Sequence, residues 1–310
     1  MIIRNNISLQ ELSWVKSDKI RLESDKAHRV KKLYFPESTD EFSTLIRNLY
    51  EKNEHFDVLG YCSNTLLLPT YDIENVVSTR LLTQWFEDKS SIYCSAGVSV
   101  MQLSKIMIEE GIKGFDSFVN LPGTVAAAVY GNSGCYGNTM IEMVKNVTII
   151  QPDGTFKVLS GNDLCATHRS TIFKRHECDG VIISVELKKE SGDRLTIQRN
   201  ASSYEMDRRN HYPAAANNLG STLNLYSRSC FGKIIYKVQR LYMKLTHKTS
   251  FRETIPFVLT LLCERRLIPY VWNWDRYMFL DDASHLLFNN YLRVIGLLYK
   301  DWKLEIEIRK

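Results

Sequence analysis

The segment from Leu121 to Gly137 constrains this chain more than any other part of its sequence. It reads LPGTVAAAVYGNSGCYG, and small or turn-forming residues dominate it. Such residues allow backbone N–H groups to approach a phosphate closely, because no bulky side chain holds the phosphate away. The segment is therefore a candidate for binding a diphosphate, although a run of alanines is also typical of close helix packing.

A second candidate loop lies upstream, at residues 58–69, and reads VLGYCSNTLLLP. Ser63, Asn64 and Thr65 add hydroxyl and amide donors to its backbone. The sequence predicts short strands at 56–59 and 66–68, and a strand, a polar turn and a second strand commonly present backbone amides to a ligand. Each loop alone is better explained as an ordinary turn, so only the two together indicate a cofactor site.

The remaining pattern mixes helices and strands without repeating strand–helix–strand units, which favours an α+β fold over a doubly wound parallel sheet. Apolar spacing predicts helices at 40–53, 98–110, 232–246, 252–264 and 283–299, and strands at 91–97, 180–188 and 303–310. Residues 144–158 are typical of a hairpin that turns at Asp153-Gly154. The polar segment 189–205 is the candidate domain boundary. We therefore expect one domain at 1–200, with subdomains at about 1–70 and 71–200, and a second at 201–310.

Composition limits the other classes of function. The chain has 310 residues, of which 44% are hydrophobic, and no apolar run approaches the roughly 20 residues of a membrane span. Its N-terminus lacks the apolar block of a signal peptide, so we expect a cytoplasmic protein that does not bind membranes. The seven cysteines are scattered and form no CxxC pair, which predicts reduced thiols and no metal site.

Positive charge is concentrated in the C-terminal third. Residues 1–200 contain 23 Lys and Arg against 25 Asp and Glu, whereas residues 201–310 contain 17 against 10. This surplus suits an anionic ligand such as a nucleotide diphosphate, and general solubility explains it equally well. The basic residues do not form one run, so nucleic acid is not an expected partner. A monomer or weak dimer is the default expectation.

The two loops, in this order and spacing, resemble the UDP-N-acetylenolpyruvoylglucosamine reductases, the MurB family. The family's second loop is of the type I-P-G-T-V-G-G-A-V-x-x-N-x-G-A-Y-G. HRSTIFK at 168–174 resembles the family's Y-R-x-S-x-F-K, and LEIEI at 304–308 resembles its L-E-P-E-V. The segment 208–222 resembles an arginine and a proline followed by Gly-Ser. The second loop matches at Pro122, Gly123, Thr124, Val125, Ala128, Val129, Asn132, Gly134, Tyr136 and Gly137.

The resemblance implies the FAD-binding fold of the vanillyl-alcohol-oxidase type, followed by a smaller α/β substrate domain. It implies an FAD-dependent oxidoreductase that uses NADPH to reduce the enolpyruvyl group of UDP-N-acetylglucosamine enolpyruvate or a related nucleotide sugar. Arg169 and Glu307, rather than Glu305, would then stabilise the enolate, and Ser221 would donate the proton. Arg208 and Asn224 would bind substrate. The implied FAD-binding residues are Gly60, Cys62, Ser63, Asn64, Thr65, Leu66, Pro122, Gly123, Thr124, Ala127, Asn132, Ser133, Gly134, Tyr136, Gly137, Val181 and Ile182.

The sequence departs from the family pattern at several positions. Cys62 replaces a glycine of the first loop, and His168 replaces a tyrosine. The family continues F-K-N-P after the proton donor, where this chain has Leu223 to Tyr226. These losses fall mostly on the substrate side and leave two alternatives open. One is another flavin oxidoreductase or oxidase that acts on a different sugar in surface-polysaccharide synthesis. The other is a non-catalytic binding protein that retains the FAD fold.

Overall fold

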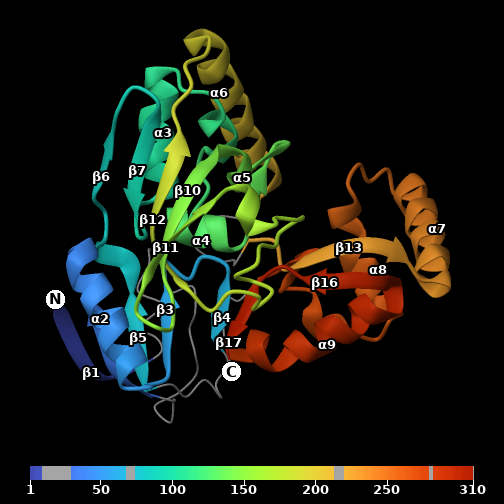
Figure 1. Cartoon of the computed structure of the whole chain (residues 1–310). Coiled ribbons are helices and arrows are strands. Elements are labelled where there is room, and N and C mark those ends of the chain that lie inside the picture. The colour runs from blue at the N-terminus through green and yellow to red at the C-terminus, as the bar shows by residue number, and fades with distance from the viewer. Residues whose placement is uncertain (9–28, 68–73, 213–219, 279–281, 310) are drawn as a thin grey trace. The chain divides into compact units, whose positions relative to one another are not determined.

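The computed structural model describes residues 1–8, 29–67, 74–212, 220–278 and 282–309. The chain forms two compact units (Figure 1). The first comprises Met1–Ile7, Arg29–Cys62 and Asp72–Tyr212, and the second comprises Ser8–His28, Ser63–Tyr71 and Pro213–Lys310. The chain therefore passes between the units more than once.

The first unit begins with a four-stranded sheet in the order β1 (Ile2–Ser8), β2 (Arg29–Phe35), β5 (Asn75–Ser78) and β3 (Phe56–Leu59). β5 pairs in parallel with both β2 and β3. Helix α2 (Thr39–Glu51) connects β2 to β3, and the Ser38 side chain caps it by accepting a hydrogen bond from the Glu41 amide.

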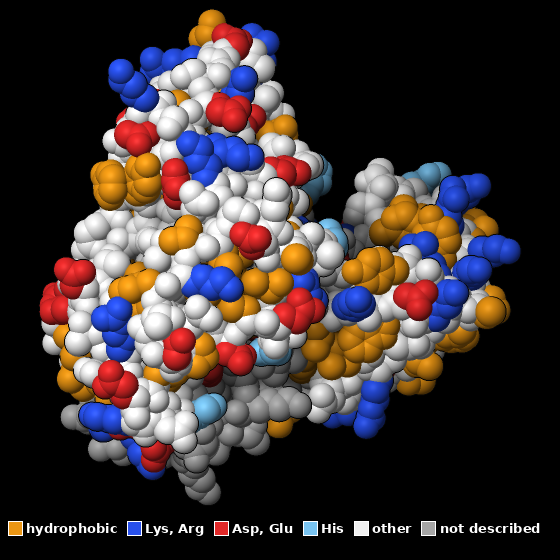
Figure 2. Space-filling view, viewed as in Figure 1, with side chains coloured by type: hydrophobic (Ala, Val, Ile, Leu, Met, Phe, Trp, Pro, Cys, Tyr) orange, Lys and Arg blue, Asp and Glu red, His pale blue; other side chains and the backbone are white. Residues whose placement is uncertain are grey.

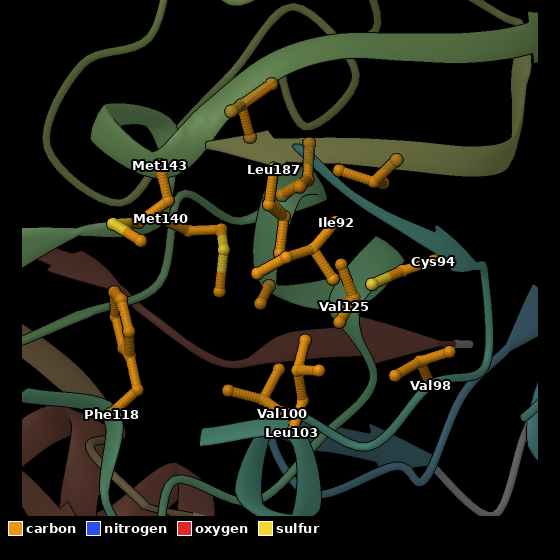
Figure 3. Close-up of a cluster of buried hydrophobic side chains, with 14 of the residues drawn as sticks. Ile92, Cys94, Val98, Val100, Leu103, Phe118, Val125, Met140, Met143 and Leu187 are labelled. Carbon is orange, nitrogen blue, oxygen red and sulfur yellow. The ribbon is translucent and has the colours of Figure 1, made fainter. Parts of the chain in front are cut away.

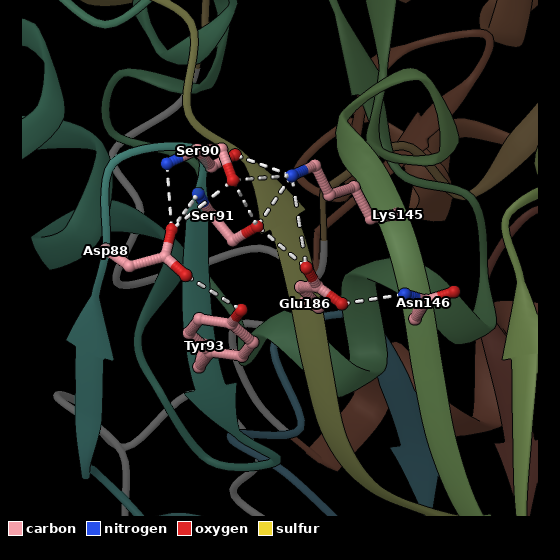
Figure 4. Close-up of polar contacts among 7 residues, drawn as sticks. All are labelled: Asp88, Ser90, Ser91, Tyr93, Lys145, Asn146 and Glu186. Atoms are coloured by element: carbon pink, nitrogen blue, oxygen red, sulfur yellow. Dashed lines mark hydrogen bonds and ion pairs between the residues drawn. The ribbon is translucent and has the colours of Figure 1, made fainter.

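A five-stranded antiparallel sheet forms the rest of the unit's framework. Its order is β11 (Phe156–Ser160), β10 (Val144–Ile150), β12 (Val181–Lys188), β7 (Ser91–Ser95) and β6 (Trp85–Glu87). A polar network joins three of these strands (Figure 4), in which Lys145 Nζ and Ser91 Oγ lie 2.6 Å apart. Burial alone would raise the pKa of Glu186, but hydrogen bonds from Asn146 and Ser91 lower it.

The main core lies between this sheet and three helices, α3 (Val100–Glu110), α4 (Val125–Tyr130) and α6 (Arg194–His211) (Figure 3). A second cluster contains Phe42 and Ile46 of α2 together with residues of both sheets, so α2 fills the space between the two sheets. Short elements complete the unit: β8 (Gly134–Cys135), β9 (Asn138–Thr139), α5 (Met140–Met143), and the 3-10 turns Thr79–Leu81, Phe115–Phe118 and Asn162–Leu164.

The described residues of the second unit form three strand pairs and three helices. β13 (Leu223–Arg228) pairs antiparallel with β16 (Tyr299–Leu304), and β14 (Val271–Asn273) pairs antiparallel with β15 (Arg276–Tyr277). β4 (Thr65–Leu67) pairs in parallel with β17 (Glu307–Arg309). The helices and 3-10 turns are α7 (Cys230–Leu245), α8 (Ile255–Leu261), α9 (Asp282–Leu298), Phe251–Thr254 and Arg265–Leu267.

The structure confirms the α+β class and the predicted helices and hairpin to within a few residues at their ends. Two predicted strands differ. The strand at 66–68 is β4 at Thr65–Leu67, and residue 68 lies outside the described residues. The strand at 303–310 is two strands, β16 and β17, because the chain leaves the ladder at Glu305, whose amide donates to the Thr222 carbonyl at 2.9 Å.

The boundaries of the units also differ from those predicted. The boundary at 200 falls inside α6, and the first unit continues to Tyr212. The segment 189–205 is polar because it is mostly an exposed helix, in which only Ile197 and Ala201 are buried. Residues 63–71 group with the second unit, because β4 pairs with β17. The subdomain limit near 70 is also displaced, since β5 at 75–78 is a central strand of the first sheet.

No helix in the described part of the chain is both long and apolar enough to cross a lipid bilayer. Within the same residues no cluster of His, Cys, Asp and Glu side chains has the composition of a metal site. All seven cysteines are free in the structure.

Candidate functional site

The two glycine-rich loops meet at Gly60 and Thr124. Gly60 follows β3, and a Cβ atom placed on it would lie 2.9 Å from Thr124 Oγ1. Only glycine allows the two loops to approach this closely, which explains the residue type at position 60. The structure therefore brings together two predicted cofactor-binding segments whose contacting residues, Gly60 and Thr124, are 64 positions apart in the sequence.

Arg80 is a buried cation beside the first loop. Its side chain is only 7% exposed, and its Nε donates to the Gly60 carbonyl at 3.3 Å. Burial lowers the pKa of Arg80, while the Cys62 thiol and the Tyr61 hydroxyl act in the opposite direction. Nothing in the local sequence TRLL signals this role, because the partner lies 20 residues upstream and is reached only through the β3–β5 pairing.

Cys62 adopts the left-handed backbone conformation, with a φ of 52°, and its side chain is buried. Glycine is the residue that enters this region without steric cost, and a residue with a Cβ pays about 1–2 kcal/mol. The glycine of the family's first loop thus corresponds to a position that needs a positive φ. The cysteine keeps that backbone shape at some cost in stability.

Backbone hydrogen bonds fix the second loop to the segment that leads from β7 into α3. Val125 N donates to the Val98 carbonyl at 2.8 Å, and Val100 N donates to the Gly123 carbonyl at 3.1 Å. The Thr124 side chain caps α4 by accepting a hydrogen bond from Ala127 N at 3.3 Å. The loop is consequently held rigid by groups that do not face a ligand, as a preorganised binding site requires.

Asn132 connects the second loop to the segment that carries Arg169. Its side chain is 4% exposed, donates to the Thr167 carbonyl at 2.9 Å and accepts from Ile141 N at 3.2 Å. Arg169 occupies the tight turn in which Thr167 and Ser170 exchange backbone hydrogen bonds, and its φ is 54°. A left-handed arginine is strained, and strain of this kind concentrates at functional sites.

The Arg169 guanidinium lies against Gly134 of the second loop. A Cβ atom on Gly134 would come within 2.8 Å of both Arg169 Nη1 and the Asn138 carbonyl oxygen. Position 134 therefore requires a residue with no side chain so that this cation can pass. The structure thus places a predicted catalytic residue directly beside predicted flavin-binding residues.

Tyr136 and Arg208 form a second contact between distant predicted residues. Tyr136 stacks on Tyr204, with ring centroids 4.1 Å apart, and its hydroxyl donates to Asp207 Oδ2 at 2.9 Å. Burial, followed by this hydrogen bond, raises the pKa of Tyr136. Arg208 Nη2 lies 2.9 Å from the Cys135 sulfur, so the end of α6 packs along the second loop.

Other predicted cofactor residues remain predictions. Val181 and Ile182 begin β12, opposite Ile150 and Ile149, and the Ile182 side chain belongs to the core, so only its backbone is available to a ligand. Ser133 N donates to the Ala128 carbonyl and helps to close α4. The structure assigns no particular contact to Pro122 beyond its place in the second loop.

Within the second unit, three predicted residues from distant segments meet. Asn64 Nδ2 donates to the Ser221 carbonyl at 3.2 Å, and Glu307 N donates to the Asn64 carbonyl at 3.0 Å. Asn64 thereby bridges the predicted proton donor and the predicted enolate-stabilising acid. Ser63, Thr65 and Leu66 flank this bridge, and Thr65 is the register partner of Glu307 in the parallel pair.

A rigid support lies behind Ser221. Thr222 is fully buried, its amide donates to the Asp275 carbonyl at 2.7 Å, and its hydroxyl accepts from Tyr277 N at 3.0 Å. Asn224, the predicted substrate residue, lies two positions further on in β13, and its partner across the ladder is Lys303. In the family pattern a lysine stands at the position of Asn224. This chain lacks that lysine, but Lys303 places a cation on the neighbouring strand opposite Asn224.

The residues of the first unit fit a dinucleotide. Backbone with positive φ recurs at Cys62, Asn132, Tyr136 and Gly137, and successive turns of this kind direct N–H groups into concavities that bind anions. The buried cation Arg80 lies beside the first loop, and charged donors form the stronger hydrogen bonds to phosphate. Both observations suit a diphosphate.

Comparison with known proteins agrees with this geometry. Residues 30–160 match the model of the FAD binding domain family. A UDP-N-acetylenolpyruvoylglucosamine reductase of Lactiplantibacillus plantarum is 26% identical over 204 residues, covering 65% of this chain and 66% of the relative. Those of Thermosipho melanesiensis and Fervidobacterium nodosum are each 31% identical, over 46% and 52% of this chain and 49% and 52% of the relatives. The matches thus span about half to two thirds of the relatives.

The crystal structure of the corresponding reductase (MurB) from Thermus caldophilus superposes with a TM-score of 0.67 at 16% identity, covering 100% of both chains. Residues 30–160 are therefore similar to an FAD binding domain, and the chain shares the fold of that reductase. Over about half to two thirds of its length the chain is similar in sequence to UDP-N-acetylenolpyruvoylglucosamine reductases.

Proposed function

We propose that this chain is an FAD-dependent oxidoreductase that uses NADPH to reduce the enolpyruvyl group of UDP-N-acetylglucosamine enolpyruvate or a related nucleotide sugar in the cytoplasm. The observation that carries the proposal is the bridge from Ser221 through Asn64 to Glu307. Asn64 and Ser221 are 157 residues apart in the sequence. Both hydrogen bonds involve backbone groups, so they fix the segments that carry Ser221 and Glu307 relative to each other within the second unit.

The proposed reaction determines what the side chains must do. Reduction of the carbon–carbon double bond adds a hydride to one carbon and a proton to its neighbour, which bears the carboxylate. When bound, FAD supplies the two-electron chemistry that links NADPH to the substrate. Negative charge develops on the neighbouring carbon and its carboxylate before the proton arrives.

Three residues answer these needs. The Arg169 guanidinium and the Glu307 carboxyl group stabilise the developing enolate. Ser221 holds a proton on Oγ and delivers it to the carbon, and water then restores that proton. The buried Thr222 keeps Ser221 in place, and the strained turn at Arg169 fixes the direction of its side chain.

Substrate recognition is assigned to Arg208, Asn224 and Lys303. Two are cations that suit the phosphates and carboxylate of a nucleotide sugar. The departures at Leu223 to Tyr226 lie on β13, which carries Asn224, and they favour a second candidate, in which the substrate is another nucleotide sugar. Both candidates share the flavin chemistry and differ only in the second half-reaction.

Flavin absorbance, followed through the two half-reactions, tests the proposal. Protein purified with FAD should be yellow, should bleach with NADPH in the absence of oxygen, and should recover its colour when the enolpyruvyl nucleotide is added. Recovery with a different nucleotide sugar alone would select the second candidate. Protein that stays colourless in excess FAD would contradict both.

The role of Ser221 has its own test. Ser221→Ala should leave reduction by NADPH unchanged and slow the second half-reaction by about 10²–10⁴-fold, since it removes a positioned proton donor. Ser227→Ala, on strand β13 that follows Ser221, is the matched control and should affect neither half-reaction. Equal loss of both half-reactions in Ser221→Ala would exclude a proton-donor role.

A further inference from the structure

Helix α7 carries a stripe of large apolar side chains that are exposed to solvent. The stripe consists of five residues at alternating spacings of three and four, and it runs along the whole helix. Their exposed fractions are 43% at Phe231, 59% at Ile234, 38% at Val238, 58% at Leu241 and 72% at Leu245. At 1.5 Å per residue the stripe is about 20 Å long. A stripe of this size on a protein surface marks an interaction site.

A second stripe of basic side chains runs beside the apolar one. It consists of Lys233, Lys237, Arg240 and Lys244, all of them exposed. At about 100° per residue, the centres of the two stripes are about 110° apart around the helix axis. No carboxylate in the described part of the chain forms an ion pair with any of the four. At the position of α7, Figure 2 shows apolar and basic side chains side by side on the surface.

The third face of α7 attaches the helix to its own unit. Gly232, Ile235 and Gln239 are buried, and Gln239 Nε2 donates to Thr254 Oγ1 at 2.7 Å. Tyr242 stacks on Phe257, with ring centroids 3.9 Å apart. The exposed stripe is therefore not a core face that happens to lack a neighbour, because the helix already has a complete packing face.

Charge and shape identify the partner. Pairing with a second copy of α7 would bring two rows of four cations together, and like charges at such an interface are repulsive. A nucleic acid would match the cations but would offer no apolar surface to the stripe. The stripe is also a convex ridge, so a protein partner would need a complementary groove, whereas a lipid surface deforms around a helix.

We propose that α7 docks the protein onto an anionic membrane surface, with the apolar stripe inserted at the level of the lipid head groups and the basic stripe against lipid phosphates. A basic helix with one apolar face lies in the membrane interface in this way and requires no transmembrane span. The surplus of positive charge in the C-terminal third thus has a second use besides binding a nucleotide. Figure 1 shows α7 and β17, which carries Glu307, at opposite ends of the second unit, so docking leaves that part of the unit uncovered.

Vesicle sedimentation of the full-length flavoprotein tests the proposal. Phosphatidylcholine vesicles and vesicles of phosphatidylcholine and phosphatidylglycerol in a 7:3 ratio are compared at low and at high salt. The protein should partition at least tenfold more strongly onto the anionic vesicles at low salt, and high salt should weaken that binding. Absence of binding to the anionic vesicles at low salt would overturn the proposal.

Two charge variants test the contribution of the basic stripe. Replacing Lys233, Lys237, Arg240 and Lys244 with Gln should lower partitioning at least tenfold. The matched control replaces the same amount of charge on the first unit and should retain most of the binding; it changes Lys52, Lys89, Lys105 and Lys157 to Gln, all of them exposed. Equal loss in both variants would show non-specific attraction and overturn the proposal.

The double variant Ile234→Ser/Leu241→Ser should reduce partitioning onto anionic vesicles while flavin absorbance and circular dichroism stay unchanged, because both residues are on the surface. Unchanged partitioning would exclude insertion of the stripe. Light scattering completes the test. A dimer that this variant dissociates would identify a second copy as the occupant of the stripe and would also overturn the proposal.

Discussion

At the scale of single residues, the most informative side chain is Arg80. A buried arginine needs polar partners, and those of Arg80 include the Gly60 carbonyl, Cys62 and Tyr61. Its side chain holds the first loop and places a positive charge beside that loop. A diphosphate bound by the loop would be attracted by this charge.

Arg80→Met should weaken FAD binding by about 10–100-fold, because a hydrogen bond to a charged group is worth about 1.5–3 kcal/mol. Flavin fluorescence titration measures the change. Arg47→Met is the matched control, since Arg47 Nε also donates to a glycine carbonyl, that of Gly154, at 3.0 Å in the same unit. Unchanged FAD affinity in Arg80→Met would show that the arginine only supports the fold.

The pair of Tyr136 and Asp207 gives a prediction about pH. The hydrogen bond from Tyr136 is the main cause that lowers the pKa of Asp207. A carboxyl group with a lowered pKa stabilises the fold above its unfolded pKa, and this stability is lost as the pH falls through the folded pKa. The raised pKa of Tyr136 has the opposite sign: its contribution is complete below the unfolded pKa and is lost as the pH rises.

Tyr136→Phe should therefore return the pKa of Asp207 toward its ordinary value, and carbon NMR of the carboxyl group would detect the rise. The variant should lose less stability than the wild type between neutral and acidic pH. The matched control is Tyr93→Phe, which removes a hydroxyl that donates to Asp88 at 3.0 Å, away from the loops. An Asp207 pKa that does not move would contradict the assigned hydrogen bond.

At the scale of elements, the short hairpin of β8 and β9 lets Arg169 pass. Gly134→Ala would force a methyl group to within 2.8 Å of a carbonyl oxygen and of the guanidinium. Overpacking of this kind costs about 1–3 kcal/mol. We expect a lower melting temperature and a slower second half-reaction, with FAD still bound.

Gly131→Ala is the control for Gly134→Ala. The φ of Gly131 is −91°, and the nearest atom to an added Cβ would lie 3.7 Å away, so this change should be tolerated. Calorimetry and single-turnover kinetics on both variants distinguish a crowded contact from a general intolerance of the loop. If both variants behave like the wild type, Gly134 does not constrain Arg169.

Elements with a strong local pattern could be predicted from the sequence. The hairpin at 144–158 has its Asp153-Gly154 turn, and α2 has its apolar spacing and a serine cap. Contacts that depend on distant segments could not. Nothing local signals that Arg80 reaches Gly60, or that the terminal strand breaks at Glu305 and turns to pair with β4. The break depends on the Thr222 carbonyl, which lies 83 residues upstream.

The same distinction holds for the site. Its two loops could be predicted, because close backbone approach and positive φ select glycine and other small residues, which are recognisable in the sequence. The polar α6 was not recognised as a helix within the first unit, because only Ile197 and Ala201 give it a buried face. Asn64 could be placed in a cofactor loop but not identified as the bridge between Ser221 and Glu307.

At the scale of the whole molecule, the second unit is not a continuous stretch of chain, since it includes Ser63–Tyr71. A fragment of residues 213–310 would lack β4 and the Asn64 hydrogen bonds. Each such bond contributes about 1 kcal/mol, so the two Asn64 bonds and the β4–β17 pairing together form a sizeable part of the roughly 5–15 kcal/mol that stabilises a domain. We therefore expect the fragment to show no cooperative thermal transition by circular dichroism.

Fusing residues 62–72 to the fragment through a long Gly/Ser linker should restore the transition. The same fusion with Asn64→Ala should melt at a lower temperature. A fragment of 213–310 that melts cooperatively without the added segment would show that β4 is dispensable for folding.

The interruption of the second unit also affects how this protein can diversify. The chain crosses between the units five times, after Ile7, His28, Cys62, Tyr71 and Tyr212. A single recombination event therefore cannot replace the second unit as a whole. If only the segment after Tyr212 were exchanged, β17 would lose its native partner β4. New specificity must instead arise by substitution within segments such as β13. The departures from the family pattern at Leu223 to Tyr226, all on β13, are consistent with substitutions of this kind.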